Sequence, residues 1–169
     1  MPDKINGLPA HILLVHAVVV LVPLAALLSV LAIAWPAARR KLGVVVPVTA
    51  LAGLAFVPLA SQAGEWLQEH VKETALVEKH TSLGDGLLVW ALLLFVLATV
   101  YWLLDFAPTR NWRLPAFATT KAARAVVSVA LAAVAVVSVV QVYRIGDSGA
   151  KAAWHNQYSD TATGHGDGD

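Results

Sequence analysis

The chain has 169 residues and a formal net charge of +1; 58% of the residues are hydrophobic and only 14% are charged. Together with a mean hydropathy of +0.68, this composition excludes an ordinary soluble domain and predicts one compact domain inside a membrane. The absence of cysteine excludes disulfides, thiolate metal ligands and cysteine nucleophiles. We find no glycine-rich phosphate loop, nucleophile elbow or aromatic-rich basic patch, so we predict no catalytic residue and no nucleic-acid partner.

Four apolar stretches are long enough, as helices, to cross a hydrocarbon core of about 30 Å. The first contains no Asp, Glu, Lys or Arg, and the four lie at about 10–35, 42–63, 86–104 and 125–143. We therefore predict an all-α fold, an integral membrane four-helix bundle occupying residues 1–148. The remaining residues, 149–169, form a polar segment that we expect to be a flexible C-terminal tail.

The connection between the second and third spans has the pattern of an amphipathic helix. Its glutamates and its apolar residues both recur every fourth position: Glu65, Glu69 and Glu73, and Leu67, Val71 and Ala75. Such a helix either extends the second span or lies at the membrane interface, with Trp66 as an anchor.

Small residues at helical spacing predict faces where helices pack closely. Ala60 and Gly64 form such a pair near the end of the second span. The fourth span carries a longer stripe, which consists of Ala125, Ser128, Ala132 and Ala135. We interpret both as packing surfaces within the bundle. We find no internal sequence repeat of the kind that many transporters contain.

The distribution of basic residues predicts the orientation. The connections after spans one and three hold seven basic residues and one acid, namely Arg39, Arg40, Lys41, Arg110, Arg113, Lys121, Arg124 and Asp105. The rest of the polar chain has ten acids and five basic residues. We therefore expect a multi-pass protein of the plasma membrane with both termini, the amphipathic helix and all six histidines outside the cytoplasm.

Polar residues from every span are expected to meet at this outer side. We call them the polar rim, and they are His11, Glu65, His70, Asp85, Arg144 and Asp147, with His16 and His80 beside them. His11 and His16 lie about 140° apart on their helix at ~100° per residue, so they should have different partners. Arg144 should pair with Glu65, Asp85 or Asp147, because an unpaired charge at this depth is costly.

Four segments together resemble one known family. They are GLPAHILLVH at the start, AGEWL after the second span, HTSLGD before the third and VYRIGDSGAKAAW after the fourth. Over Gly7 to Trp154 the chain resembles the bacterial membrane proteins of domain-of-unknown-function family 2231, most closely the actinobacterial members. The resemblance implies four membrane helices, unassigned biochemistry and, in some relatives, a link to iron-sulfur electron-transfer modules. Gly146 and Asp147 stand where the broader family has Gly-His, so the resemblance supplies no histidine from span four.

Three classes of function agree with these observations. The first is a non-enzymatic accessory or scaffold subunit that contacts lipid and other membrane or electron-transfer proteins. The second is an electron-transfer protein in which His16 and His80 bind a b-type haem. The third is a proton-coupled transporter or channel, since histidines and carboxylates inside a membrane also serve proton transfer. A metal site formed by Glu65, His70 and His80 lacks any close ligand motif, so we predict no metal site.

Overall fold

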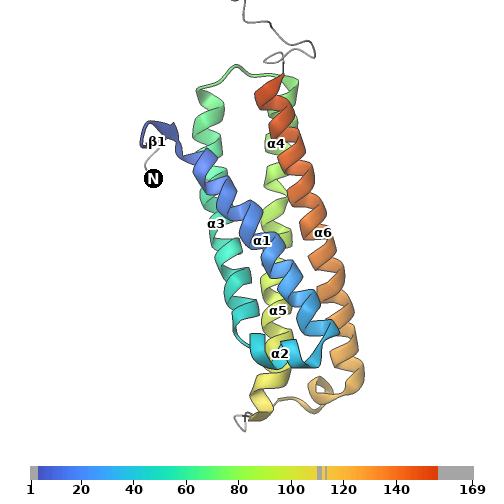
Figure 1. Ribbon diagram of the computed structural model, residues 1–169. Coiled ribbons are helices and arrows are strands. Elements are labelled where there is room, and N and C mark those ends of the chain that lie inside the picture. Colours follow the sequence, from blue (N-terminus) through green and yellow to red (C-terminus); the bar gives the residue numbers. More distant parts are fainter. Residues whose placement is uncertain (1–3, 110–111, 113, 156–169) are drawn as a thin grey trace, which may run out of the picture.

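The computed structural model describes residues 4–109, 112 and 114–155, and this part of the chain is almost entirely helical. Four long apolar helices stand side by side (Figure 1): α1 (Ala10–Ala34), α3 (Val45–Glu69), α5 (Leu87–Thr109) and α6 (Lys121–Trp154). All four are long and apolar enough to cross a membrane. The predicted all-α membrane bundle is therefore confirmed.

Successive long helices run in opposite directions (Figure 1). Each long helix packs on two neighbours: α1 lies against α3 and α6, and α5 lies against the same two helices. The short helix α2 (Pro36–Leu42) and the 3₁₀ turn η1 (Ala116–Thr119) connect helices at one end, which we call the arginine end. The opposite end, where α1 and α4 (Ala75–Asp85) begin and α3 and α6 finish, is called the histidine end.

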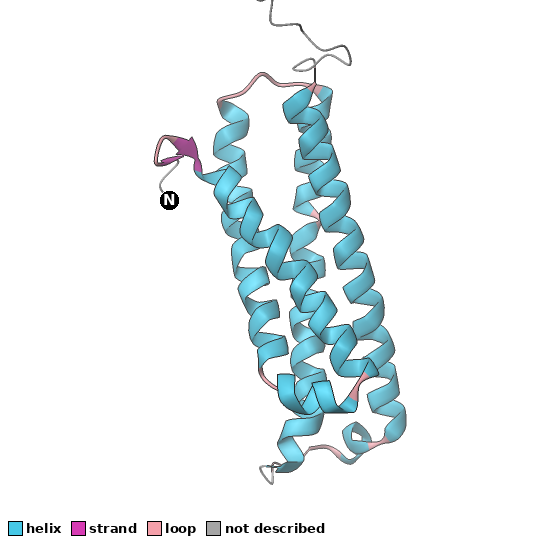
Figure 2. Cartoon of the chain, in the orientation of Figure 1, coloured by secondary structure: helices cyan, strands magenta, loops and turns pink. Residues whose placement is uncertain are grey.

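The amphipathic segment divides into two parts, which are separated by a loop in Figure 2. Its first part extends the second span, since α3 continues to Glu69. The second part is α4, which is capped by Thr74 through a hydrogen bond from the Val77 amide to the threonine hydroxyl. A short helical break at Gly86 separates α4 from α5.

The segment before α1 is a small hairpin rather than an irregular lead. Strands β1 (Lys4–Ile5) and β2 (Leu8–Pro9) pair in antiparallel fashion. The turn residues Asn6 and Gly7 have φ angles of 51° and 82°, which is the conformation that Asn-Gly favours in two-residue hairpins. At the other terminus α6 continues to Trp154, past the expected boundary at residue 148, and residues 156–169 of the predicted tail lie outside the described residues.

The two halves of the bundle repeat one pattern of burial. In α1, five buried residues follow His11 along the sequence: Val18, Val22, Ala25, Ser29 and Ala32. In α5, five buried residues follow His80 at the same sequence distances: Leu87, Ala91, Leu94, Ala98 and Tyr101. Counting back from Gly64 and from Gly149, buried residues again coincide: Val57, Gly53, Ala50 and Val46, and Val142, Ser138, Ala135 and Leu131. The corresponding helices, α1 with α5 and α3 with α6, run in the same direction (Figure 1). The two halves are therefore related by an axis along the bundle. The two halves thus share a pattern of burial, although the sequence shows no internal repeat.

Candidate functional site

His11 joins the first two long helices at the histidine end. Its Nδ1 donates a hydrogen bond of 2.8 Å to the carbonyl oxygen of Ala60 on α3. The imidazole occupies the space beside Gly64, where a β-carbon would lie 3.0 Å from two ring atoms. The predicted small pair Ala60 and Gly64 thus admits a histidine ring, not only a helix backbone.

His80 repeats this arrangement between α4 and α6. Its Nδ1 lies 3.1 Å from the carbonyl oxygen of Ile145 and 3.1 Å from the hydroxyl of Ser148. A β-carbon at Gly149 would lie 2.9 Å from the ring. In both cases the carbonyl belongs to the residue four positions before the glycine, so one geometry occurs twice. We call each of these a histidine–glycine contact.

The two rings meet across the axis between the halves. Their centroids are 6.2 Å apart and their planes are nearly perpendicular, at 82°. A carbonyl only accepts hydrogen bonds, so each Nδ1 carries a proton, and in the neutral imidazole Nε2 is then the nitrogen with a free lone pair. Metal-binding histidines commonly make such a hydrogen bond through the ring nitrogen that does not bind the metal, which fixes the tautomer. The same hydrogen bond equally suits a purely structural histidine.

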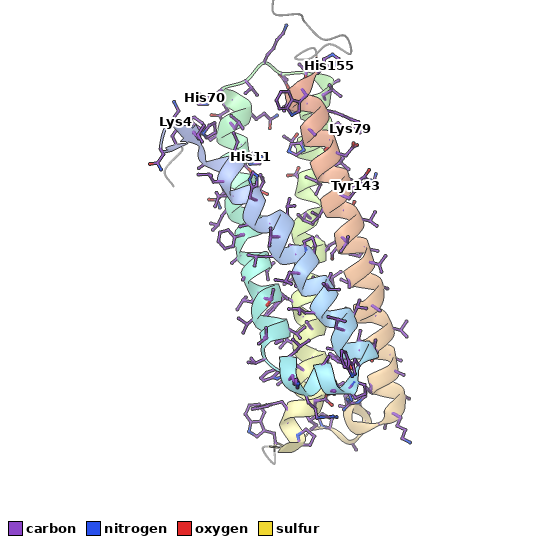
Figure 3. The ribbon with its side chains drawn as sticks, in the orientation of Figure 1. Lys4, His11, His70, Lys79, Tyr143 and His155 are labelled. Carbon is purple, nitrogen blue, oxygen red and sulfur yellow. The ribbon has the colours of Figure 1, made fainter. Side chains whose placement is uncertain are left out.

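The remaining two histidines of the predicted group that the structure describes bond to their own helices. His16 is exposed, and its Nδ1 contacts the carbonyl oxygen of Ile12 one turn earlier. His70 bonds to the carbonyl oxygen of Trp66 at 2.8 Å and stacks on that indole at 4.0 Å between centroids. The Nζ of Lys4 lies over the Trp66 ring, 5.8 Å from its centroid, and Figure 3 shows Lys4 and His70 at the histidine end. The structure therefore brings His80 to His11, and His11 and His16 have different partners as expected.

The carboxylate partner predicted for Arg144 is wrong. Arg144 is exposed and its guanidinium donates a long hydrogen bond of 3.5 Å to the side chain of Gln141. Asp147 instead forms an ion pair of 2.7 Å with Lys151, one helical turn further along α6. Glu65 and Asp85 are exposed, and neither has an ion pair within the described ranges. Because these side chains reach water or headgroups, the cost of an unpaired charge is low and no buried pair is required.

Sequence reasoning missed a polar network at the arginine end. Asp105 near the end of α5 binds two arginines, Arg39 on α2 at 2.8 Å and Arg124 on α6 through a short contact. Arg39 also donates to the hydroxyl of Tyr101 at 2.9 Å, and that hydroxyl donates to the carbonyl oxygen of Ala32 at 3.4 Å. The sequence contains an indication of this network, because Asp105 is a single acid among seven basic residues and is expected to pair with one of them.

The environment of Arg39 strengthens this network. The hydrogen bond with Tyr101, and to a smaller extent the negative charge of Asp105, raises the pKa of the Arg39 guanidinium above its usual value. Arg39 therefore stays charged at every pH that the protein meets. The network ties α2, α5 and α6 together at one end, as the histidine–glycine contacts tie the helices at the other.

The comparisons with known proteins agree with this fold. Residues 7–162 match the family model described as a predicted membrane protein, DUF2231. No curated protein and no solved structure matches the chain. The matched range includes every long helix, both histidine–glycine contacts and the arginine network. The chain therefore belongs to the DUF2231 family of predicted membrane proteins.

Proposed function

We propose that the protein is a non-enzymatic accessory or scaffold subunit of the bacterial plasma membrane. The observation that carries this proposal is the use made of the two interior histidines, each of which bonds to a carbonyl of a neighbouring helix and lies against a glycine. Groups held in this way fix the positions of helices. Asp105 is likewise shared between two arginines of other elements. The main role of these polar groups is therefore to hold the helices of the bundle together.

The surface offered to a partner lies at the histidine end. Here α3 and α6 extend beyond their most apolar parts, and α4 presents charged, exposed side chains such as Glu78 and Lys79. Figure 3 shows Lys79 and His155 at this end. With the basic connections inside, this surface faces the exterior of the cell, where a membrane or electron-transfer protein is the expected partner.

Site-specific photo-crosslinking in native membranes tests the accessory role. A photoreactive residue at Glu78, on the exposed side of α4, should give one discrete crosslinked protein product. The matched control is Val129 in the apolar part of α6, which is 71% exposed and should react with lipid alone. Failure of Glu78 to give a protein product, with α3 positions such as Glu69 equally silent, contradicts the accessory role.

Electron transfer through haem is the second candidate, and the proximity of the two imidazoles, whose centroids are 6.2 Å apart, favours it. The sequence proposes His16 and His80 as ligands, whereas the geometry favours His11 with His80. Expression with added haem, followed by visible spectra before and after reduction, separates these possibilities. A Soret band lost in His80→Ala and His16→Ala supports the first pair, and loss in His80→Ala and His11→Ala supports the second. A colourless, folded protein excludes b-type haem.

A further inference from the structure

A pocket of about 550 Å³ opens at the arginine end between α1, α2, α3 and α5. The residues that line it include the aliphatic side chains of Ala32, Val46 and Ala98, the two arginines Arg39 and Arg40, and three aromatic side chains, Tyr101, Trp102 and Phe106. The volume lies in the range of pockets that bind small molecules or headgroups. Nothing in the accessory role uses this pocket.

The pocket carries excess positive charge. Among the described residues that line it, Asp105 is the only acid, and its carboxylate is already shared by Arg39 and Arg124. Arg40 lines the pocket, is exposed and has no carboxylate partner in the described part of the chain. Arg39 uses one N–H on Asp105 and one on Tyr101, out of the five that a guanidinium provides. Donors with a net positive charge therefore remain for an anion.

The aromatic residues at the pocket opening are typical of the headgroup level of a bilayer. Trp102 and Phe106, in the last part of α5, stack with centroids 4.7 Å apart and line the opening. Aromatic side chains prefer this level of a bilayer, where their apolar bodies meet chains and their edges meet water. The pocket also adjoins α2, the connection that contains three consecutive basic residues.

We propose that this pocket binds the phosphate of an anionic phospholipid headgroup. Guanidinium groups recognise phosphate oxygens through paired, charge-assisted hydrogen bonds, and basic pockets between membrane helices suit such headgroups. Arg40 supplies the free guanidinium, and Arg39, oriented by Asp105 and Tyr101, supplies further donors. A zwitterionic lipid is disfavoured because its amine adds positive charge beside these arginines. The proposal goes beyond the accessory role and does not depend on it.

The test uses the full chain reconstituted in vesicles of equal parts phosphatidylcholine and phosphatidylglycerol. After gentle detergent extraction, native mass spectrometry counts the lipids retained on the protein. The wild type should retain phosphatidylglycerol in preference to phosphatidylcholine. Arg40→Gln should weaken this retention about tenfold, the usual scale for one hydrogen-bonded charge.

Lys41→Gln is the matched control, because it removes one positive charge from the next residue of α2 without altering the pocket lining. It should retain the lipid as the wild type does. Equal losses in the two variants would reveal diffuse attraction to an anionic surface and overturn the proposal. So would the absence of any preference for phosphatidylglycerol. Circular dichroism confirms that both variants are folded.

A third arm distinguishes the lipid from free phosphate. Inorganic phosphate is added to protein carrying phosphatidylglycerol, and to delipidated protein. Retention of the lipid in excess phosphate supports a headgroup site. Displacement of the lipid, with phosphate binding to the wild type and not to Arg40→Gln, would reassign the pocket to a free anion and overturn the lipid proposal.

Discussion

Each interior histidine depends on a glycine that leaves room for its ring. The space beside Gly64 holds His11, and the space beside Gly149 holds His80. Since each ring is also held by a hydrogen bond to a carbonyl, it cannot move aside without losing that bond. The residues that fix the helix positions are therefore as much the glycines as the histidines.

Replacing Gly149 by Ala should destabilise the bundle. The new β-carbon would lie 2.9 Å from the His80 ring, which must shift away from the Ile145 carbonyl. We expect a loss of about 1–3 kcal/mol in the free energy of unfolding, measured as a lower melting temperature in detergent.

Gly146→Ala is the control for this substitution. It lies one turn earlier on α6, and nothing is within 4 Å of the added β-carbon. Alanine should therefore leave stability unchanged or raise it by up to about 1 kcal/mol, because glycine is the weaker helix former. Equal melting temperatures for the two variants would refute the histidine–glycine contact as a stabilising unit.

Some of these residue contacts can be predicted from the sequence. Ala60 and Gly64 marked a close approach, and the 140° separation of His11 and His16 correctly implied different partners. The pairing of His11 with His80 was beyond reach, because it depends on which turn of α4 lies beside α1. Arg144 was misjudged since helical spacing does not tell how far a long side chain extends into water.

At the level of elements, Asp105 is the junction of three helices. Asp105→Asn removes the negative charge that Arg39 and Arg124 share and leaves two arginines in close proximity. The side chain of Asp105 is 33% exposed, so we expect a loss of about 1–3 kcal/mol, less than for a fully buried pair. Thermal unfolding in detergent measures it.

Asp85→Asn at the opposite end of the third span provides the comparison. Asp85 is exposed and has no ion pair within the described residues, so its substitution should leave the melting temperature unchanged. Added salt should stabilise the Asp105→Asn variant relative to the wild type, because it screens the repulsion between the arginines. Similar melting temperatures for both asparagine variants would show that the network contributes little.

The helix α4 should respond to its cap independently of the bundle. Thr74→Ala removes the acceptor for the Val77 amide, at a cost of about 1 kcal/mol to this helix. Hydrogen exchange of amides in residues 75–85 should become faster, whereas α3 should be unaffected. Thr49→Ala in α3, whose hydroxyl bonds within its own helix, is the control. Unchanged exchange in α4 would mean that packing on α6 alone holds it.

Element boundaries were predicted where hydropathy changes and missed where it does not. The first span was expected at 10–35 and is Ala10–Ala34. The continuation of α3 to Glu69 confirms one of the two alternatives for the amphipathic segment. The fourth helix extends further than expected, to Trp154, because a helix continues in polar sequence as long as its residues favour it. The stripe on the fourth span was only partly right, since Ala135 is buried and Ala125 is exposed.

On the scale of the whole molecule, the bundle is two copies of one helical pair. The sequence does not show this repeat because few residues are identical between the halves, among them His11 and His80, Gly64 and Gly149, and Val57 and Val142. The feature that repeats is the set of buried positions on each helix, and these positions are known only from the packing of the helices. At the arginine end the copies differ, since Ala32 corresponds to Tyr101.

The orientation can be tested directly because the chain contains no cysteine. A single Lys72→Cys variant places a thiol in the exposed connection at the histidine end, and Lys41→Cys places one at the arginine end. With the basic connections inside, an impermeant maleimide should label position 72 in intact cells and position 41 only after lysis. The reverse pattern would invert the proposed topology.

The repeated pair also has a consequence for how the protein is made. The contact between His11 and Gly64 needs only α1 and α3, and none of α4, α5 or α6 takes part in it. The second pair likewise contains its own contact, between His80 and Gly149. Since chains emerge from the ribosome N-terminus first and fold unit by unit, each hairpin can insert with its histidine–glycine contact already formed. The ion pair between Arg39 and Asp105 joins the two hairpins and forms when they associate. Biogenesis of the bundle then requires only the lateral association of two preformed hairpins in the lipid.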